Sequence, residues 1–418
     1  MPVTGATAAI DFQVVIDLEG RVAGLGLLPH AEPPAPNDGL VPPREIEMSV
    51  GVGDDALPGT FTLPDGDGPF PAVVLVHGSG PSDRDGNFAG NRPFRDLAHG
   101  LAARGVAALR YDKRSFARLP SLLAHGEALT VQHETIDDAV AAVTWLRARA
   151  EIDAARVFVL GHSLGGMVAP RIAQAARADG MIVMAGATRP LPEMMIEQTE
   201  YIAALDDSVT AEEAAQITQL KAAVAALRDP AQAGGGQLGA PRGYFSDLEA
   251  HDAPAEAAAL DIPVLVLQGG RDYQVTMKDF ERWKLALAGR PRACVKVYGA
   301  LDHLMRAGEG PSGPNDYAVP RPVAVEVIDD VAAFVLQGCG APHRWSPHGQ
   351  YPPQWRPLPP PSLCGCGPVP KVAWTIRRSE ATRTVQPPPV HRPGAPHPWS
   401  TNAATSSITS VATGRGTA

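Results

Sequence analysis

The chain has 418 residues, 44% of them hydrophobic, which is enough to bury one large core. Its formal net charge of −9 argues against nucleic acid or an anionic membrane surface as a partner. No uncharged apolar run is long enough to cross a bilayer, and residues 1–30 lack the basic start and apolar core of a signal peptide. We therefore expect a cytoplasmic protein with no membrane span.

The four cysteines indicate neither a disulfide framework nor a metal site. Cys294 falls in a predicted buried strand, and Cys339 ends the globular region. Cys364 and Cys366 lack the second pair of cysteine or histidine residues that a zinc ion needs. The sequence therefore predicts no metal, and it favours a reducing compartment.

Two regions precede the functional motifs. Residues 1–43 contain a candidate hairpin at 12–25 and then a proline-rich linker. From residue 44 to about 340, apolar strand-like runs alternate with helical patterns. This alternation predicts one α/β domain over 44–340, built on a mostly parallel sheet flanked by helices.

The first strand that bears a motif is 71–76, and it leads into His77-Gly78-Ser79-Gly80-Pro81. A glycine-rich bend at the carboxyl end of a strand can turn a backbone N–H toward a developing negative charge on oxygen. We expect the N–H of Ser79 to be one donor of an oxyanion hole, with His77 and Gly78 beside the bound substrate. Alone, this motif is only a turn signal.

The most specific motif lies at 157–166, where an apolar strand ends in Gly161-His162-Ser163-Leu164-Gly165 and a helical pattern follows. This is the strand–turn–helix context of a nucleophile elbow, in which a tight turn exposes one serine. The two glycines leave room where strand and helix nearly collide. Ser163 is therefore the expected nucleophile, and the N–H of Leu164 is the second expected oxyanion donor.

The alternation stops between residues 190 and 260, where helical patterns alone are present. Thr210 and Glu213 form a capping-box pattern that predicts the start of one of these helices. We expect a helical lid over the nucleophile. Four apolar residues of the lid are assigned to the wall of the acyl pocket, although contacts that merely fix the lid to the core explain each of them equally well: Met194, Met195, Tyr244 and Phe245.

A serine hydroxyl needs a general base, and the base needs an acid that orients it. Asp272 follows the strand-like run 262–268, and His303 follows the next run, 293–298. Their order after Ser163 is the order Ser, Asp, His that the nucleophile elbow leads us to expect. Asp302 is rejected as the orienting acid because side chains of adjacent loop residues diverge. His162 is expected to point away from the nucleophile.

These motifs together resemble the α/β-hydrolases, in the bacterial esterase branch related to dienelactone hydrolases and acetyl esterases. The resemblance covers about residues 45–338 and implies hydrolysis of carboxylic esters through an acyl-enzyme, without a cofactor. The hairpin at 12–25 resembles the last part of a small N-terminal domain that members often carry. The segments that bear the resemblance are 77–86, 110–114, 161–165, 267–273 and 301–303.

We therefore expect a carboxylesterase-type serine hydrolase acting on small-molecule esters with short to medium acyl chains. Three alternatives remain on the same fold. A peptidase or amidase would use the same three residues. An acyltransferase would need a drier site beneath the lid, and a non-catalytic binding module would need no nucleophile at all.

The last region, 341–418, differs sharply in composition. It holds 16 of the 42 prolines, and its 8 basic residues against 1 acidic residue give it a charge of +7. No apolar period runs through it, so we expect disorder. A proline-rich docking arm and an out-of-frame extension of the gene are the alternatives.

Overall fold

The computed structural model describes residues 43–229, 231 and 238–339, together with the backbone of three strands at 10–16, 22–29 and 409–410. Eight strands form the central sheet, in the spatial order β10-β9-β8-β7-β5-β6-β4-β3. Pairing is parallel from β10 to β6 and antiparallel where β4 joins β6 and β3. This confirms the predicted mostly parallel sheet. The strands are β3 (Arg44–Val50), β4 (Leu57–Leu63), β5 (Phe70–Val76), β6 (Ala107–Tyr111), β7 (Ile152–His162), β8 (Gly180–Met184), β9 (Val264–Gly269) and β10 (Ala293–Tyr298).

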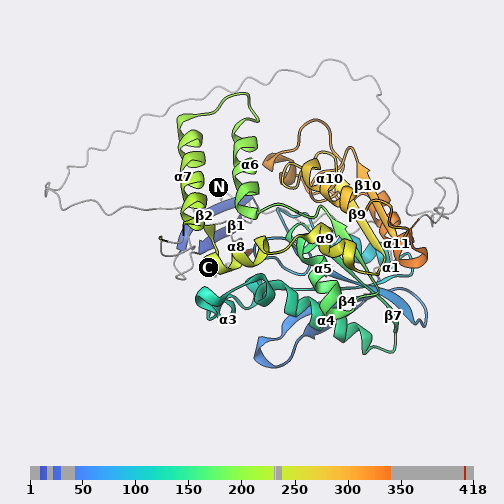
Figure 1. The fold of residues 1–418 in the computed structure, drawn as a ribbon. Coiled ribbons are helices and arrows are strands. Elements are labelled where there is room, and N and C mark those ends of the chain that lie inside the picture. The colour runs from blue at the N-terminus through green and yellow to red at the C-terminus, as the bar shows by residue number, and fades with distance from the viewer. Residues whose placement is uncertain are drawn as a thin grey trace, which may run out of the picture.

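Helices cover both faces of this sheet (Figure 1). Strands β5, β8 and β9, and β7 from Val157 to His162, are buried almost throughout, because helices exclude water from both of their sides. On one face, Phe94, Leu97 and Ile328 pack against the sheet from α1 (Pro93–Ala102) and α11 (Val325–Gln337). On the other face the covering helices are α4 (Asp137–Arg147), α5 (Leu164–Ala176), α9 (Ala253–Ala259) and α10 (Met277–Ala286).

The predicted helical insertion lies between β8 and β9. It contains α6 (Leu191–Ala203), α7 (Ala211–Arg228) and α8 (Arg242–Glu249). The capping box predicted at Thr210 is confirmed: its side chain accepts from the Glu213 N–H, and the Glu213 carboxylate accepts from the Thr210 N–H. Figure 1 shows α6 and α7 side by side, projecting away from the sheet.

Two short α-helices, a 3₁₀ turn at Gly126–Ala128 and a π-helical turn connect β6 to α4. The helices are α2 (Arg114–Ala117) and α3 (Leu119–Leu123), and the π-helical turn at Gln132–Ile136 leads directly into α4. The sequence predicts the amphipathic helix at α4 but gives no sign of the π-helical turn. Such turns are rare in proteins and are frequent at functional sites.

The N-terminal hairpin and the tail lie largely outside the described residues. The backbone of β1 (Ile10–Ile16) pairs antiparallel with β2 (Val22–Pro29), as a hairpin does. β1 also pairs with β11 (Thr409–Ser410), which belongs to the proline-rich tail. The linker of 31–37 and the rest of the predicted disordered tail fall outside the described part of the chain.

The structure corrects the expectation for two cysteines. Cys294 on β10 forms a disulfide with Cys339, just after α11, and the two Cα atoms are 5.7 Å apart. Sequence spacing does not reveal this pair, because the end of α11 meets the edge strand only in the folded chain. The link spans 45 residues, and a closed loop of that length is worth about 4 kcal/mol in the chain-entropy model. Because the expectation of a reducing compartment rested on unpaired cysteines, this disulfide leaves that expectation without support.

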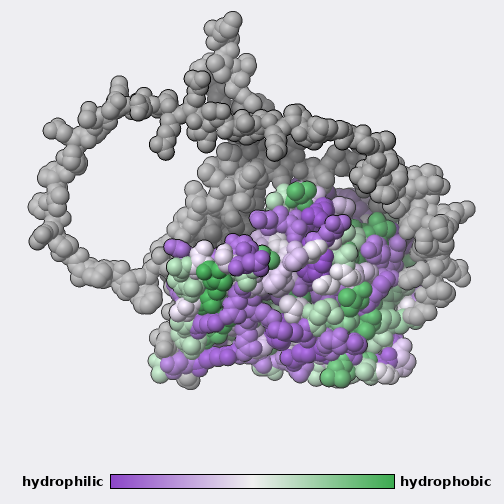
Figure 2. Space-filling view, turned by 90° about the horizontal axis from the view of Figure 1, so that it is seen from above, coloured by the Kyte–Doolittle hydropathy of each residue, from purple (hydrophilic) through white to green (hydrophobic). Residues whose placement is uncertain are grey.

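The face of the described residues seen in Figure 2 is mostly polar. Figure 2 shows hydrophilic residues over most of the visible described surface, with hydrophobic residues in small separate groups. Within the described ranges, no helix combines the length and apolarity that crossing a membrane requires.

In a parallel sheet of this kind, a site is expected at the carboxyl ends of the strands, where the loops after β5, β7, β9 and β10 meet.

Candidate active site

Ser163 occupies the tight turn between β7 and α5. Its backbone has φ 56° and ψ −116°, which is a conformation that L-residues other than glycine rarely adopt. Such a conformation costs about 1–3 kcal/mol and persists only when the surroundings impose it. The Ser163 N–H donates to the Met184 carbonyl, and its own carbonyl accepts from the Met167 N–H, so both neighbouring elements hold the turn. The strand–turn–helix geometry predicted for this segment is confirmed.

The glycines around this turn are required by close backbone contacts. A Cβ at Gly161 would lie 2.1 Å from the Gly165 carbonyl oxygen, and a Cβ at Gly165 would lie 2.4 Å from the Val76 carbonyl oxygen. A Cβ at Gly78 would lie 3.0 Å from the Ser163 Cβ and 3.5 Å from its Oγ. The loop after β5 therefore passes directly beside the Ser163 side chain.

Asp272 and His303 are brought together, 2.7 Å apart between Oδ2 and Nδ1. The Asp272 carboxylate is buried and accepts three further hydrogen bonds: from the Gln268 side chain at 3.1 Å and from the N–H groups of Gln274 at 2.8 Å and Val275 at 3.0 Å. These four hydrogen bonds hold the Asp272 carboxylate in one orientation, and the carboxylate in turn fixes the orientation of the His303 imidazole. Gln268 is a supporting residue that the sequence analysis missed.

His162 makes a contact that the sequence did not predict, while its expected direction away from the nucleophile stays a prediction. Its Nε2 lies 2.9 Å from the His303 carbonyl oxygen, and the two imidazole rings are 4.6 Å apart. The residue next to Ser163 therefore holds the backbone of the residue proposed as its base. Sequence could not reveal this contact, because the partners are 141 positions apart and meet only when β7 and the loop after β10 lie in one sheet.

His77 is also buried. Its Nε2 lies 2.9 Å from the Asp83 carbonyl oxygen, and its ring packs against Phe94 and Tyr111. Burial, with the Lys113 charge as the second cause, lowers the pKa of His77 to about 3. Burial and the neighbouring His303 likewise lower the pKa of His162 to about 3. Both imidazoles are therefore neutral at pH 7 and can donate to the carbonyls they face.

We expect these two histidines to make the protein sensitive to acid. In the unfolded chain each histidine binds a proton once the pH falls below its ordinary pKa of 6.5. In the folded protein the same histidines stay neutral until the pH falls to about 3. Their stabilisation is present above pH 6.5 and is lost as the pH falls toward 3, by roughly 2 kcal/mol for each residue between pH 6.5 and 5. Urea unfolding at several pH values measures this slope. His77→Gln should reduce it, and an unchanged slope in that variant would contradict the assignment.

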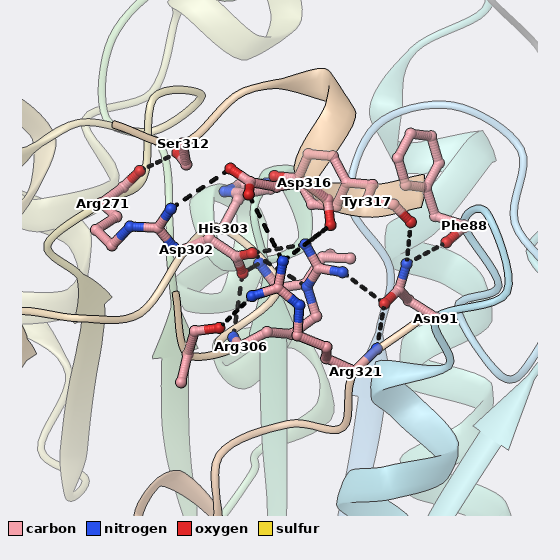
Figure 3. Close-up of polar contacts among 12 residues, drawn as sticks. Phe88, Asn91, Arg271, Asp302, His303, Arg306, Ser312, Asp316, Tyr317 and Arg321 are labelled. Atoms are coloured by element: carbon pink, nitrogen blue, oxygen red, sulfur yellow. Dashed lines mark hydrogen bonds and ion pairs between the residues drawn. The ribbon is translucent and has the colours of Figure 1, made fainter. Parts of the chain in front are cut away.

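A buried ion-pair network fixes the loop that carries His303 (Figure 3). Arg306 donates to the Asp302 carboxylate at 2.7 Å and to the Asn91 side-chain oxygen at 2.5 Å, and its guanidinium lies 4.5 Å from the centre of the Tyr317 ring. Asp302 also accepts from the N–H groups of Leu304 and Arg306. Asp302 is therefore committed to Arg306, which agrees with rejecting it as the orienting acid.

Replacing Arg306 with methionine should lower the free energy of unfolding by about 3–5 kcal/mol, because Asp302 would keep a buried charge without its partner. The measurement is urea unfolding at pH 7. Arg321→Met is the matched control: Arg321 lies in the same network but is partly exposed, 3.6 Å from Asp316, and such pairs are worth about 0–1 kcal/mol. Equal losses in the two variants would contradict the prediction.

The residues expected at the substrate lie in two environments. Ser79 is exposed and Gly78 is half-buried beside Ser163, whereas Met194 and Phe245 are buried in the main core cluster. Met195 packs against that cluster from a half-buried position. Tyr244, the last of the residues expected in the acyl pocket, is also buried, and its hydroxyl donates to the Glu134 carboxylate at 2.6 Å. Their part in substrate binding stays a prediction.

Known proteins are similar to this chain. A family model described as serine aminopeptidase, S33, matches residues 69–307. Esterase EstD of Thermotoga maritima is 41% identical over 325 residues, which cover 78% of this chain and 76% of that protein. An uncharacterized protein of Mycobacterium tuberculosis is 27% identical over 175 residues, 41% of this chain and 56% of that protein.

Among solved structures, Est1E from Butyrivibrio proteoclasticus aligns with 69% of this chain and 97% of its own, with 15% identity and a TM-score of 0.45. The assignment rests instead on the family model, which spans more than half of the chain, and on the 41% identity with esterase EstD. The chain belongs to the α/β-hydrolase superfamily, in the family described as serine aminopeptidase S33.

Proposed function

We propose that the protein is a serine hydrolase that cleaves carboxylic esters of small molecules through an acyl-enzyme. The observation that carries this proposal is the 2.7 Å hydrogen bond between Asp272 and His303, whose carbonyl is bound by His162, the neighbour of Ser163 in the strained turn. The 41% identity with an esterase over most of both chains supports the reaction class. Short to medium acyl chains remain our expectation for the substrate.

In the proposed mechanism, the Ser163 Oγ attacks the ester carbonyl carbon while His303 Nε2 takes the hydroxyl proton. The carbonyl oxygen becomes an oxyanion and accepts hydrogen bonds from the N–H groups of Ser79 and Leu164. Asp272 keeps the proton on His303 Nδ1 and stabilises the imidazolium. His303 then protonates the leaving alcohol, and a water molecule repeats the sequence on the acyl-enzyme. Side chains and backbone groups of this chain carry every step.

A peptidase is the second candidate, because the matching family model is described as a serine aminopeptidase. Ester and amide hydrolysis share the nucleophile, the base and the oxyanion donors. Recognition of a free amino terminus adds one requirement, an acidic group beside the acyl site. Three carboxylates near the site are engaged with other partners: Asp272 binds His303, Asp302 binds Arg306, and Glu134 binds Lys113. We therefore favour ester hydrolysis.

The test compares p-nitrophenyl esters of increasing acyl length with matched aminoacyl p-nitroanilides. We expect turnover of the short and medium esters, and labelling by a fluorophosphonate probe that peptide mapping assigns to Ser163. Faster turnover of the anilides would replace the esterase by the peptidase. Absence of both turnover and labelling would reject a serine hydrolase.

A further inference from the structure

Lys113 is a buried lysine beside the predicted oxyanion loop. It lies two residues after β6, and 2% of it is exposed. Its ammonium group donates to the carbonyl oxygens of Gly78 at 2.8 Å and Gly80 at 3.2 Å, and it pairs with the Glu134 carboxylate at 3.0 Å. All three of its N–H donors therefore have a partner. A fully buried lysine is uncommon and has to be paired, and here one carboxylate and two backbone carbonyls hold the ammonium group.

The Gly78 carbonyl belongs to the same peptide unit as the Ser79 N–H. In a trans peptide the carbonyl and the N–H of one unit point in opposite directions. Because the Gly78 carbonyl is held by Lys113, the Ser79 N–H has to point away from Lys113. The Gly78 Cα carries this peptide past the nucleophile, since a Cβ built there would lie 3.5 Å from the Ser163 Oγ.

Glu134 ties this lysine to the lid insertion. It lies in the π-helical turn Gln132–Ile136, is itself buried, and accepts a 2.6 Å hydrogen bond from the Tyr244 hydroxyl on α8. Burial and the Glu134 charge keep the pKa of Tyr244 well above its usual value, so the hydroxyl stays a donor. A continuous polar chain therefore runs from α8 through Glu134 and Lys113 to the Gly78 carbonyl.

We propose that Lys113 is a positioning residue for ester hydrolysis: by holding the Gly78 and Gly80 carbonyls, it aims the Ser79 N–H at the oxyanion. The inference rests on the proposed function, since it takes Ser79 as an oxyanion donor. The charge of Lys113 also polarises the peptide unit between Gly78 and Ser79, which makes the Ser79 N–H a stronger hydrogen-bond donor. Glu134 and Tyr244 hold the ammonium group in place.

The test is Lys113→Met, assayed with a p-nitrophenyl ester and with the thionoester in which sulfur replaces the carbonyl oxygen. Sulfur is a weak hydrogen-bond acceptor, so the oxyanion donors contribute much less to the thionoester. We expect kcat for the oxygen ester to fall about 10- to 100-fold with KM changed by less than about twofold. The ratio of oxygen-ester to thionoester kcat should fall by about tenfold or more.

A control must separate positioning from the loss of a buried ion pair. Arg114 is adjacent in sequence and pairs with the buried Asp138 at 2.6 Å, and its guanidinium binds Asp138 and Asp55 rather than the 77–81 loop. Arg114→Met should lower the unfolding midpoint and leave the ester-to-thionoester ratio unchanged. An equal fall of the ratio in Arg114→Met would overturn the proposal.

A second variant keeps the proposal testable if Lys113→Met folds poorly. Lys113→Met combined with Glu134→Gln removes both charges, so no unpaired charge is buried. We expect the double variant to recover the unfolding midpoint while its kcat and its ester-to-thionoester ratio stay low. Recovery of the ratio together with the midpoint would show that Lys113 only stabilises the fold. Fluorophosphonate labelling of the unaltered protein separates the two failures: without labelling the proposed function is wrong, whereas labelling with an unchanged ratio in Lys113→Met rejects this inference alone.

Discussion

Ser163→Ala is expected to lower kcat for a p-nitrophenyl ester by about 10⁶-fold, because losing the nucleophile costs about as much as losing all three catalytic side chains. The variant should also lose all labelling by a fluorophosphonate probe. Its fold should be retained, since the Ser163 contacts with Met184 and Met167 use backbone atoms that alanine keeps. Steady-state kinetics and urea unfolding of the same preparations check both statements.

Ser163→Gly is the matched control for this substitution. It removes the same hydroxyl, but it also relieves the left-handed backbone conformation at φ 56°. Glycine adopts such angles without a steric cost, so the free energy of unfolding should rise by about 1 kcal/mol above that of Ser163→Ala. Residual esterase activity within about tenfold of the unaltered protein in both variants would mean that another residue is the nucleophile.

The parts of the site that sequence predicts are those that follow from the ends of strands. Parallel strands place their carboxyl ends at one edge of a sheet, so residues after β5, β7, β9 and β10 have to meet there. Ser163 and Gly78 lie together, and Asp272 contacts His303, for this reason. The elbow glycines were also predictable, because their role depends on local backbone geometry.

The parts that sequence does not predict depend on contacts between distant segments. Glu134 of the Lys113–Glu134 pair lies in a π-helical turn, whereas the periodicity over 136–146 indicates only an ordinary amphipathic helix. From the sequence, the segment 110–114 contributes only to the resemblance to the α/β-hydrolases, and its contacts in the fold are not predicted. In the folded chain, Arg110 pairs with Asp85 and Glu45, Asp112 with Arg84, and Arg114 with Asp138. Arg110 and Asp112 hold the loop after β5 through Asp85 and Arg84, which no spacing in the sequence reveals.

Asp272→Asn is expected to lower kcat by about 10⁴-fold, because an amide in place of the carboxylate favours the wrong imidazole tautomer. The Asp272 Oδ1 accepts from the N–H groups of Gln274 and Val275, and an asparagine oxygen can keep both bonds. Its NH₂ group would then face His303 Nδ1, which must accept instead of donate. The proton moves to Nε2, and His303 can no longer take the Ser163 proton. The measurement is kcat at pH 7, with urea unfolding as the check on folding.

Asp302→Asn is the matched control, since it removes the charge of the other buried aspartate beside His303. Asp302 pairs with Arg306, so this variant should lose stability while kcat of the folded protein stays within about threefold of the unaltered value. The opposite pattern, a large loss of kcat in Asp302→Asn and a small one in Asp272→Asn, would transfer the orienting role to Asp302. The two aspartates therefore have separate roles toward His303. Asp272 holds the proton on the imidazole, and Asp302 holds the loop from which the imidazole projects.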